Sequence, residues 1–126
     1  MRIVQACRKL GLEFVCVHTA EDIHSGHVRI AKELGGEKSL YQVSSYHDAN
    51  EILSVADNAG ATAIHPGYGF LSENAHFASL CRRNGLVFIG PTPESMEALS
   101  DKAGLKDIMK TNGLEVIPGT QALPDV

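Results

Sequence analysis

The stretch that decides the fold reads Ala61-Thr-Ala-Ile-His-Pro-Gly-Tyr-Gly-Phe-Leu-Ser-Glu-Asn-Ala75. Its first four residues predict a short strand, which Pro66 stops because proline cannot donate to a strand ladder. Phe77 and Cys81 then lie about one turn apart, so a helix follows the glycine-bearing loop. Because strand-like and helix-like segments alternate along the whole chain, we expect an α/β fold with a mostly parallel sheet and helices on both faces.

Apolar spacing and stop signals predict the other elements. Helices are predicted at Ile3–Leu10, His27–Leu34, Ala49–Ala56 and Phe77–Cys81. Two more helices are predicted, one that starts at Pro93 behind a Thr92 cap and one that runs from a Ser100 or Asp101 cap to Gly113. Strands are predicted at Phe14–Val17, Lys38–Val43, Ala61–Ile64, Leu86–Ile89 and Leu114–Ile117. Residues 1–117 therefore form one domain, and residues 118–126 are predicted to be a linker. Open sheets of this kind usually begin with a strand, so a chain that begins with a helix indicates a Rossmann-like, doubly wound sheet whose first strand is missing.

The composition excludes several classes of protein. The 126 residues are 44% hydrophobic, which is enough for a core without a disulfide or a metal. A formal net charge of -4 disfavours a nucleic-acid binder. No apolar run approaches the roughly 18 residues of a membrane span, and the start around Arg2 and Arg8 is too polar for a signal peptide. Cys7, Cys16 and Cys81 are predicted to be reduced core thiols of a cytoplasmic protein.

The glycine loop is a candidate ligand site. Gly67 and Gly69 permit positive φ angles and a close approach of the backbone to a ligand. Ser72 is predicted to cap the following helix, whose N-terminal N–H groups would attract an anion. Ligands of open α/β sheets bind at the carboxyl ends of the strands, where this loop lies. The alternative is a tight turn that exposes Tyr68 without binding anything.

Other ligand classes have weaker support. The loop lacks the third glycine of a dinucleotide site, and no acidic residue follows the strand that ends at Ile89 to bind a ribose hydroxyl. His24 and His27 lie in a polar loop without further ligands at metal-binding spacing, so we expect surface histidines and no metal site. Lys102 lies in the first turn of a helix, where a cation is unfavourable for the helix dipole. That position favours a role toward a ligand, although a solvated lysine is the simpler interpretation.

Two long motifs identify a family. The segments His65–Ala75 and Phe88–Lys102 closely resemble the signatures of the biotin carboxylase family, with weaker matches at Arg2–Cys7, Val17–Asp22 and Val116–Thr120. The resemblance covers essentially the whole chain. It implies the N-terminal domain that precedes an ATP-grasp domain in these enzymes.

The resemblance also implies an activity. The complete enzyme is a ligase that uses MgATP and bicarbonate to carboxylate biotin on a carrier protein, through a carboxyphosphate intermediate. Positioned cations and N–H donors would stabilise the charge that develops on its oxygens. In this chain Lys102 would approach the ATP phosphates. Tyr68, with Gly67 and Gly69, would line the biotin pocket. The implied partners are the ATP-grasp domain and the biotin carrier protein, with no nucleic acid and no membrane.

The chain departs from the family pattern at both ends. Family members begin with a strand and an Asn-Arg-Gly-Glu turn, whereas this sequence starts within the next helix and stops where the ATP-grasp domain would start. We therefore expect a fragment that is inactive alone. Its own residues would include no catalytic group and no metal ligand, and it would bind ATP, Mg or biotin only weakly. The expected location is the cytoplasm, or the mitochondrial matrix of a eukaryote.

Two alternatives stay open, together with one expectation about assembly. The chain could be a non-catalytic docking or regulatory module of a carboxylase complex. It could also be the equivalent domain of another ATP-grasp ligase, such as a carbamoyl-phosphate or purine-pathway enzyme. If the missing strand is central, its neighbours have unpaired edges, which would favour a homo-oligomer or another partner chain.

Overall fold

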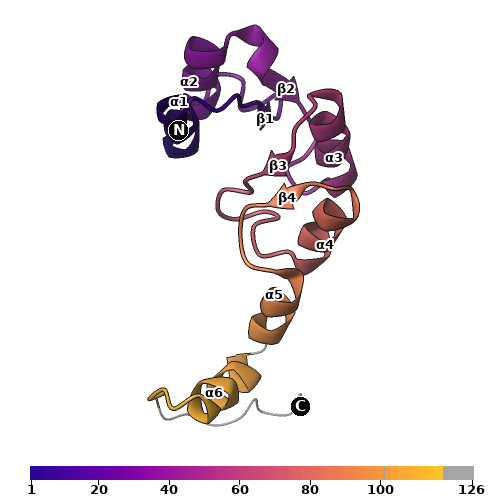
Figure 1. Ribbon diagram of the computed structural model, residues 1–126. Helices are drawn as coiled ribbons and strands as arrows, with labels where there is room; N and C mark the ends of the chain where they lie inside the picture. Colours follow the sequence, from indigo (N-terminus) through magenta and orange to yellow (C-terminus); the bar gives the residue numbers. More distant parts are fainter. Residues whose placement is uncertain (101, 118–126) are drawn as a thin grey trace.

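The computed structural model describes residues 1–100 and 102–117, without the side chains of residues 102 and 103 (Figure 1). The predicted linker at residues 118–126 and the Asp101 cap lie outside these residues. The elements within them are α1 (Arg2–Leu10), β1 (Cys16–His18), α2 (Gly26–Gly35), a short 3-10 helix (Glu37–Ser39), β2 (Leu40–Gln42), α3 (Ala49–Asn58), β3 (Ala63–Ile64), α4 (Ala75–Arg83), β4 (Val87–Phe88), α5 (Pro93–Ser100) and α6 (Lys102–Thr111). The predicted alternation of strands and helices is therefore confirmed, with shorter strands.

The strands form two small parallel sheets. β1 pairs with β2, and Val17 lies opposite Tyr41. β3 pairs with β4, and Ala63 lies opposite Val87. Parallel pairing is as predicted, but within the described residues the two pairs are not joined into the single sheet that we expected. Figure 1 places β1 and β3 as the inner strands of the two pairs.

Within the described residues, each of the inner strands has one backbone edge that pairs with no other strand. The carbonyl of His18 accepts a hydrogen bond from the N–H of Val43, so the backbone N–H and C=O of His18 point toward β2. Because the backbone groups of successive strand residues point to opposite edges, the N–H and C=O of Val17 point away from β2. The carbonyls of Thr62 and Ile64 accept hydrogen bonds from the β4 side. The backbone groups of Ala63 therefore point away from β4.

The core of the second pair forms around α4. Phe77 is 1% exposed and packs edge-on against Phe88, with ring centroids 6.0 Å apart. Cys81, one turn later, is fully buried, and burial raises the pKa of its thiol. Leu71 completes this cluster. The predicted apolar face of this helix is thus confirmed, and Cys81 is the core thiol that we expected.

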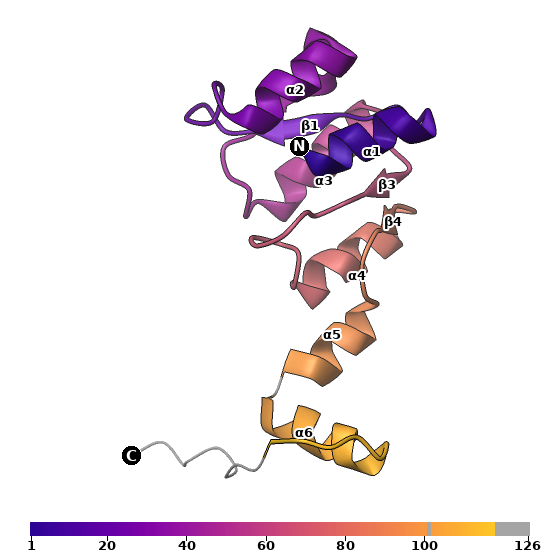
Figure 2. The same cartoon turned by 90° about the vertical axis from the view of Figure 1, so that its left-hand side faces the viewer.

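Two further predicted features are wrong. Ser72 does not cap the helix, because the chain makes a turn there and α4 begins only at Ala75, with Asn74 as its N-cap. The segment Leu114–Ile117 forms no strand. Its apolar side chains favour a strand locally, but α5 and α6 extend away from both sheets, so no strand lies beside it within the described residues (Figure 2).

Several helix ends are as predicted. Gly11 ends α1 in the left-handed conformation, with φ of 68°. Thr92 caps α5, since its Oγ1 accepts a hydrogen bond from the N–H of Ser95 at 3.2 Å. Ser100 is the last residue of α5 rather than the cap of α6. These ends depend on neighbours along the chain, which is why the sequence predicts most of them.

Candidate functional site

The glycine loop follows β3 at its carboxyl end, where the predicted site lies. Gly67 and Gly69 have φ of 70° and 73°, which confirms the predicted positive angles. A Cβ at either glycine would meet no atom within 4 Å, so the conformation requires glycine for its angle and not for lack of space. The N–H of Gly67 donates to Nδ1 of His65 at 3.0 Å. Tyr68 is 94% exposed, so its ring is free to meet a ligand.

Phe70 fixes the end of this loop. It has φ of 48°, an uncommon angle for a residue with a Cβ. Its ring packs on Tyr46, with centroids 4.9 Å apart, and edge-on against His47 at 5.2 Å. Tyr46 and His47 follow β2, so the carboxyl ends of β2 and β3 meet here.

The hydroxyl of Tyr46 connects this contact to the segment after β1. It donates to Oδ2 of Asp22 at 2.7 Å and accepts from the N–H of Thr19 at 3.3 Å. Burial and the hydrogen bond to Asp22 raise the pKa of Tyr46. The segments that follow β1, β2 and β3 are therefore joined by Asp22, Tyr46 and Phe70.

These three residues were not predicted as part of a site. Asp22 and Tyr46 lie a few residues beyond predicted strands, which was the available signal. Their contacts join positions 24 residues apart along the chain. Such a contact depends on the path of the chain, and no local pattern reports it.

Lys102 is the first residue of α6 and so lies in the first turn of a helix, as predicted, but its side chain lies outside the described residues. Both views place α6 beyond α5, at the end of the molecule away from the β-strands (Figures 1 and 2). The structure therefore does not bring α6 together with the loop of Tyr68.

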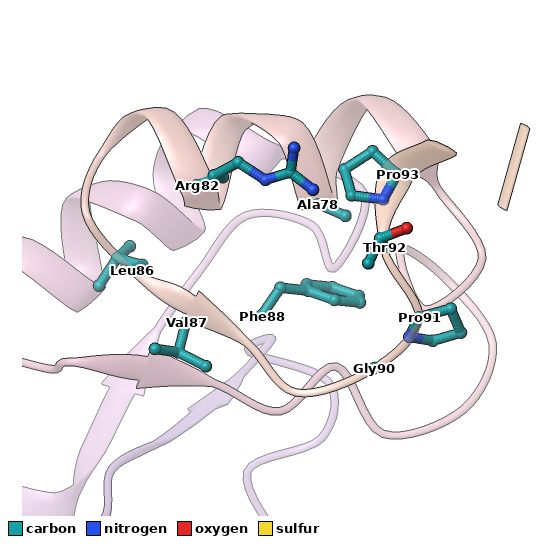
Figure 3. A pocket seen from close by; sticks show the side chains of 9 residues that line it. All are labelled: Ala78, Arg82, Leu86, Val87, Phe88, Gly90, Pro91, Thr92 and Pro93. Atoms are coloured by element: carbon teal, nitrogen blue, oxygen red, sulfur yellow. The ribbon is translucent and has the colours of Figure 1, made fainter. Parts of the chain in front are cut away.

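A pocket elsewhere holds no unpaired charge. It measures about 270 Å³ and is lined by residues of α4, by β4 and by the segment Gly90–Pro93 (Figure 3). Arg82 contributes its charged group, but the guanidinium already forms two hydrogen bonds with Glu94. The pocket has no residue of the glycine loop among its lining residues and adds nothing to that site.

Two other kinds of site find no support in residues 1–100 and 102–117. No three His, Cys, Asp or Glu side chains in this part of the chain gather closely enough to hold a metal ion. None of its helices combines the length and the apolar character that crossing a membrane requires.

Comparisons with known proteins agree with the glycine-loop motif. Residues 1–96 match the family model described as biotin carboxylase, N-terminal domain. The chain is 41% identical to the biotin carboxylase of Pseudomonas aeruginosa over 126 residues, which is 99% of this chain and 28% of that protein. It is 42% identical over 118 residues to the mitochondrial methylcrotonoyl-CoA carboxylase subunit alpha of Dictyostelium discoideum, covering 94% of this chain and 17% of the relative.

The fold agrees as well. The biotin carboxylase domain of a thermophilic 2-oxoglutarate carboxylase, solved with bound bicarbonate, is similar to this chain with a TM-score of 0.85 and 38% identity. The match covers 98% of this chain and 28% of that domain. The chain thus spans only 17% to 28% of the length of these relatives.

Proposed function

Because this chain belongs to the family of biotin carboxylase N-terminal domains, we propose that it acts as the N-terminal domain of an ATP-dependent biotin carboxylase. The whole reaction would join bicarbonate to biotin on a carrier protein at the expense of ATP. The observation that best supports this role is the glycine loop, which carries the motif that resembles the family. It lies at the carboxyl end of β3 and leaves Tyr68 exposed.

Tyr68 would contact the biotin ring system in this proposal. An aromatic ring that is 94% exposed and fixed at its backbone suits a flat, largely apolar bicyclic ligand. Gly67 and Gly69 would form the floor beside it, because neither places a side chain between the backbone and the ligand. These assignments extend the resemblance to the geometry of the loop.

Lys102 would bind the ATP phosphates. Its place at the first position of α6 supports the assignment, since a cation there opposes the helix dipole and gains from a nearby anion. Magnesium would accompany the nucleotide, but the described residues hold no cluster of metal ligands. We therefore assign no step of the reaction to a metal ligand in this part of the chain.

The doubly wound, Rossmann-like sheet belongs to the same proposal. Both strand pairs are parallel, and in the described part of the chain β1 and β3 each have one unpaired edge. One further parallel strand between them would join the pairs in the order β2-β1-x-β3-β4, where x is the added strand. This is the strand that the family pattern leads us to expect before α1.

The proposed partners are an ATP-grasp domain and a biotin carrier protein. Five large apolar side chains of α5, α6 and the segment after them are exposed, which indicates a surface that packs against further protein: Leu99, Ile108, Met109, Leu114 and Ile117. An ATP-grasp domain would cover this surface in the proposed enzyme. The proposed location is the cytoplasm or, in a eukaryote, the mitochondrial matrix.

A chimera tests the proposed function. The corresponding N-terminal segment of Pseudomonas aeruginosa biotin carboxylase, which is 41% identical, is replaced by this chain. We expect bicarbonate- and biotin-dependent ATP hydrolysis from the chimera and none from this chain alone. The variant Tyr68→Ala should raise the KM for biotin, whereas the matched control Tyr41→Phe should not. A chimera that folds and binds ATP but shows no biotin-dependent hydrolysis would contradict the proposal, as would turnover by the isolated chain.

A further inference from the structure

The exposed ring of Tyr68 needs support from elsewhere. Tyr68 is 94% exposed, and its ring is not among the aromatic contacts of the described residues. Its position therefore depends on the backbone of the loop. Gly67 and Gly69, one on each side of Tyr68, allow many backbone conformations, so a separate contact must select one of them.

Phe70 supplies that contact. Its φ of 48° lies in a region that side chains with a Cβ seldom occupy. Such an angle persists when surrounding contacts hold it, and it often marks a functional segment. The contacts here are the rings of Tyr46 and His47.

Tyr46 is fixed in turn. Its hydroxyl hydrogen bonds to Oδ2 of Asp22 at 2.7 Å and to the N–H of Thr19 at 3.3 Å. Both partners belong to the segment after β1, whereas Phe70 belongs to the loop after β3. Within the described residues the two sheets share no strand pairing, so Tyr46 spans a junction that the sheets leave unjoined.

We propose that Tyr46 and Phe70 are positioning residues that hold the glycine loop in the conformation that presents Tyr68 to its ligand. The identity of that ligand as biotin rests on the proposed function, but the positioning itself does not. Asp22 orients the Tyr46 hydroxyl, the Tyr46 ring supports Phe70, and Phe70 sets the backbone of the preceding residues. His47 adds an edge contact to the same ring.

Amide hydrogen exchange of the 126-residue chain tests the positioning without any ligand. The N–H of Ser72 donates to the carbonyl of Gly69 at 2.9 Å and reports whether the loop stays closed. Phe70→Ala and Tyr46→Leu each remove one ring of the contact that holds the loop. The loop should then open locally more often, without global unfolding of the chain, and we expect the Ser72 amide to exchange about tenfold faster. The N–H of Phe77, which donates to Oδ1 of Asn74 at 2.8 Å, should change less than about twofold.

Conservative variants separate positioning from a general loss of stability. Phe70→Tyr keeps both rings, so its Ser72 exchange rate should stay within about twofold of that of the unaltered chain. Tyr46→Phe keeps the ring but loses the hydroxyl that bonds Asp22, so its Ser72 exchange rate should lie between those of the unaltered chain and Tyr46→Leu. Tyr41→Phe, on β2 itself, is the matched control and should change nothing. The proposal is overturned if Ser72 exchange is unchanged in Phe70→Ala and Tyr46→Leu, or if exchange rises equally at Ser72 and Phe77.

A second arm uses free biotin as the probe. Fluorotyrosine labelling should give three resonances, since the chain has three tyrosines, and biotin at high concentration should shift that of Tyr68. Phe70→Ala should weaken this response, and Phe70→Tyr, whose added tyrosine gives a fourth resonance, should retain it at Tyr68. If the exchange results are as expected but biotin moves no resonance in any variant, the positioning role stands and the proposed biotin contact fails.

Discussion

Arg82 near the end of α4 and Glu94 in the first turn of α5 form two parallel hydrogen bonds, Nη1 to Oε1 at 2.7 Å and Nη2 to Oε2 at 3.0 Å. A guanidinium and a carboxylate in this paired geometry fix direction as well as distance. Since α5 leads to α6, the pair helps to set where the C-terminal helices leave the rest of the molecule (Figure 1).

This pair gives a prediction about pH. The hydrogen bonds from Arg82 are the main cause that lowers the pKa of Glu94 from 4.5 to about 2. Because the pKa of Glu94 is lower in the folded protein than in the unfolded chain, the ion pair stabilises the fold fully above pH 4.5. This stabilisation is lost as the pH falls through about 2. Both side chains are more than half exposed, so salt will screen the effect. An NMR titration of the Glu94 carboxyl should give a midpoint near 2.

Two variants check the cause of that shift. Arg82→Gln should move the Glu94 midpoint up toward 4.5, whereas the neighbouring Arg83→Gln should leave it in place. A midpoint near 4.5 in the unaltered protein would contradict the paired geometry.

The N-cap of α4 gives a prediction about stability. Oδ1 of Asn74 accepts a hydrogen bond from the N–H of Phe77 at 2.8 Å. Asn74→Ala should lower the free energy of unfolding by about 1 kcal/mol, because the first turn loses its acceptor. Ser72→Ala is the matched control and should cost less than about 0.5 kcal/mol, since Ser72 precedes the helix. Urea denaturation followed by circular dichroism measures both, and an equal loss in the two variants would mean that Asn74 is not the cap.

Gly69 gives a prediction about backbone conformation. Its φ is 73°, and the space that a Cβ would occupy is open, so Gly69→Ala should cost about 1 kcal/mol of unfolding free energy through the backbone angle alone. Gly69→Asn should cost less, because asparagine tolerates the left-handed region. Denaturation curves of the two variants compare them directly. A greater loss in the asparagine variant would point to a steric cause instead.

The free strand edges give a prediction about self-association. Within residues 1–100 and 102–117, one edge of β1 and one edge of β3 pair with no strand, which favours pairing with another chain. The mass measured by light scattering should therefore rise with protein concentration. Ala63→Pro should weaken this association, because it removes the backbone N–H that points to the edge of β3 opposite β4. It should leave the pairing with β4 intact, because the hydrogen bonds from the β4 side go to Thr62 and Ile64.

The control for this experiment is Ala63→Ser, which keeps the N–H. It should associate like the unaltered chain. Equal association of the proline and serine variants, or a monomer at every concentration, would show that the edge of β3 does not mediate contact.

The local features of the fold were accessible from the sequence. Gly11 as a helix stop, Thr92 as a cap, and the positive angles of Gly67 and Gly69 all depend on residues within a few positions. The apolar face of α4 followed from the spacing of Phe77 and Cys81. The Ser72 cap was wrong, because a turn delays the start of α4 and gives the capping bond to Asn74.

The candidate site was accessible only in part. The glycine motif located the loop and the exposed Tyr68, and its resemblance to a family predicted the match that the comparisons found. The contact between Tyr46 and Phe70, and the bond from Tyr46 to Asp22, could not be predicted in this way. They join residues that meet only after β1, β2 and β3 have brought their carboxyl ends together.

The strands show the same division. Leu114–Ile117 has the composition of a strand, yet it forms none, since a strand needs a neighbour and none lies beside it in the described part of the chain. Amino-acid order sets turns, caps and apolar faces, because these are interactions between near neighbours. Strand pairing and the support of the Tyr68 loop come from the meeting of distant segments, whose free energy depends on the path of the whole chain.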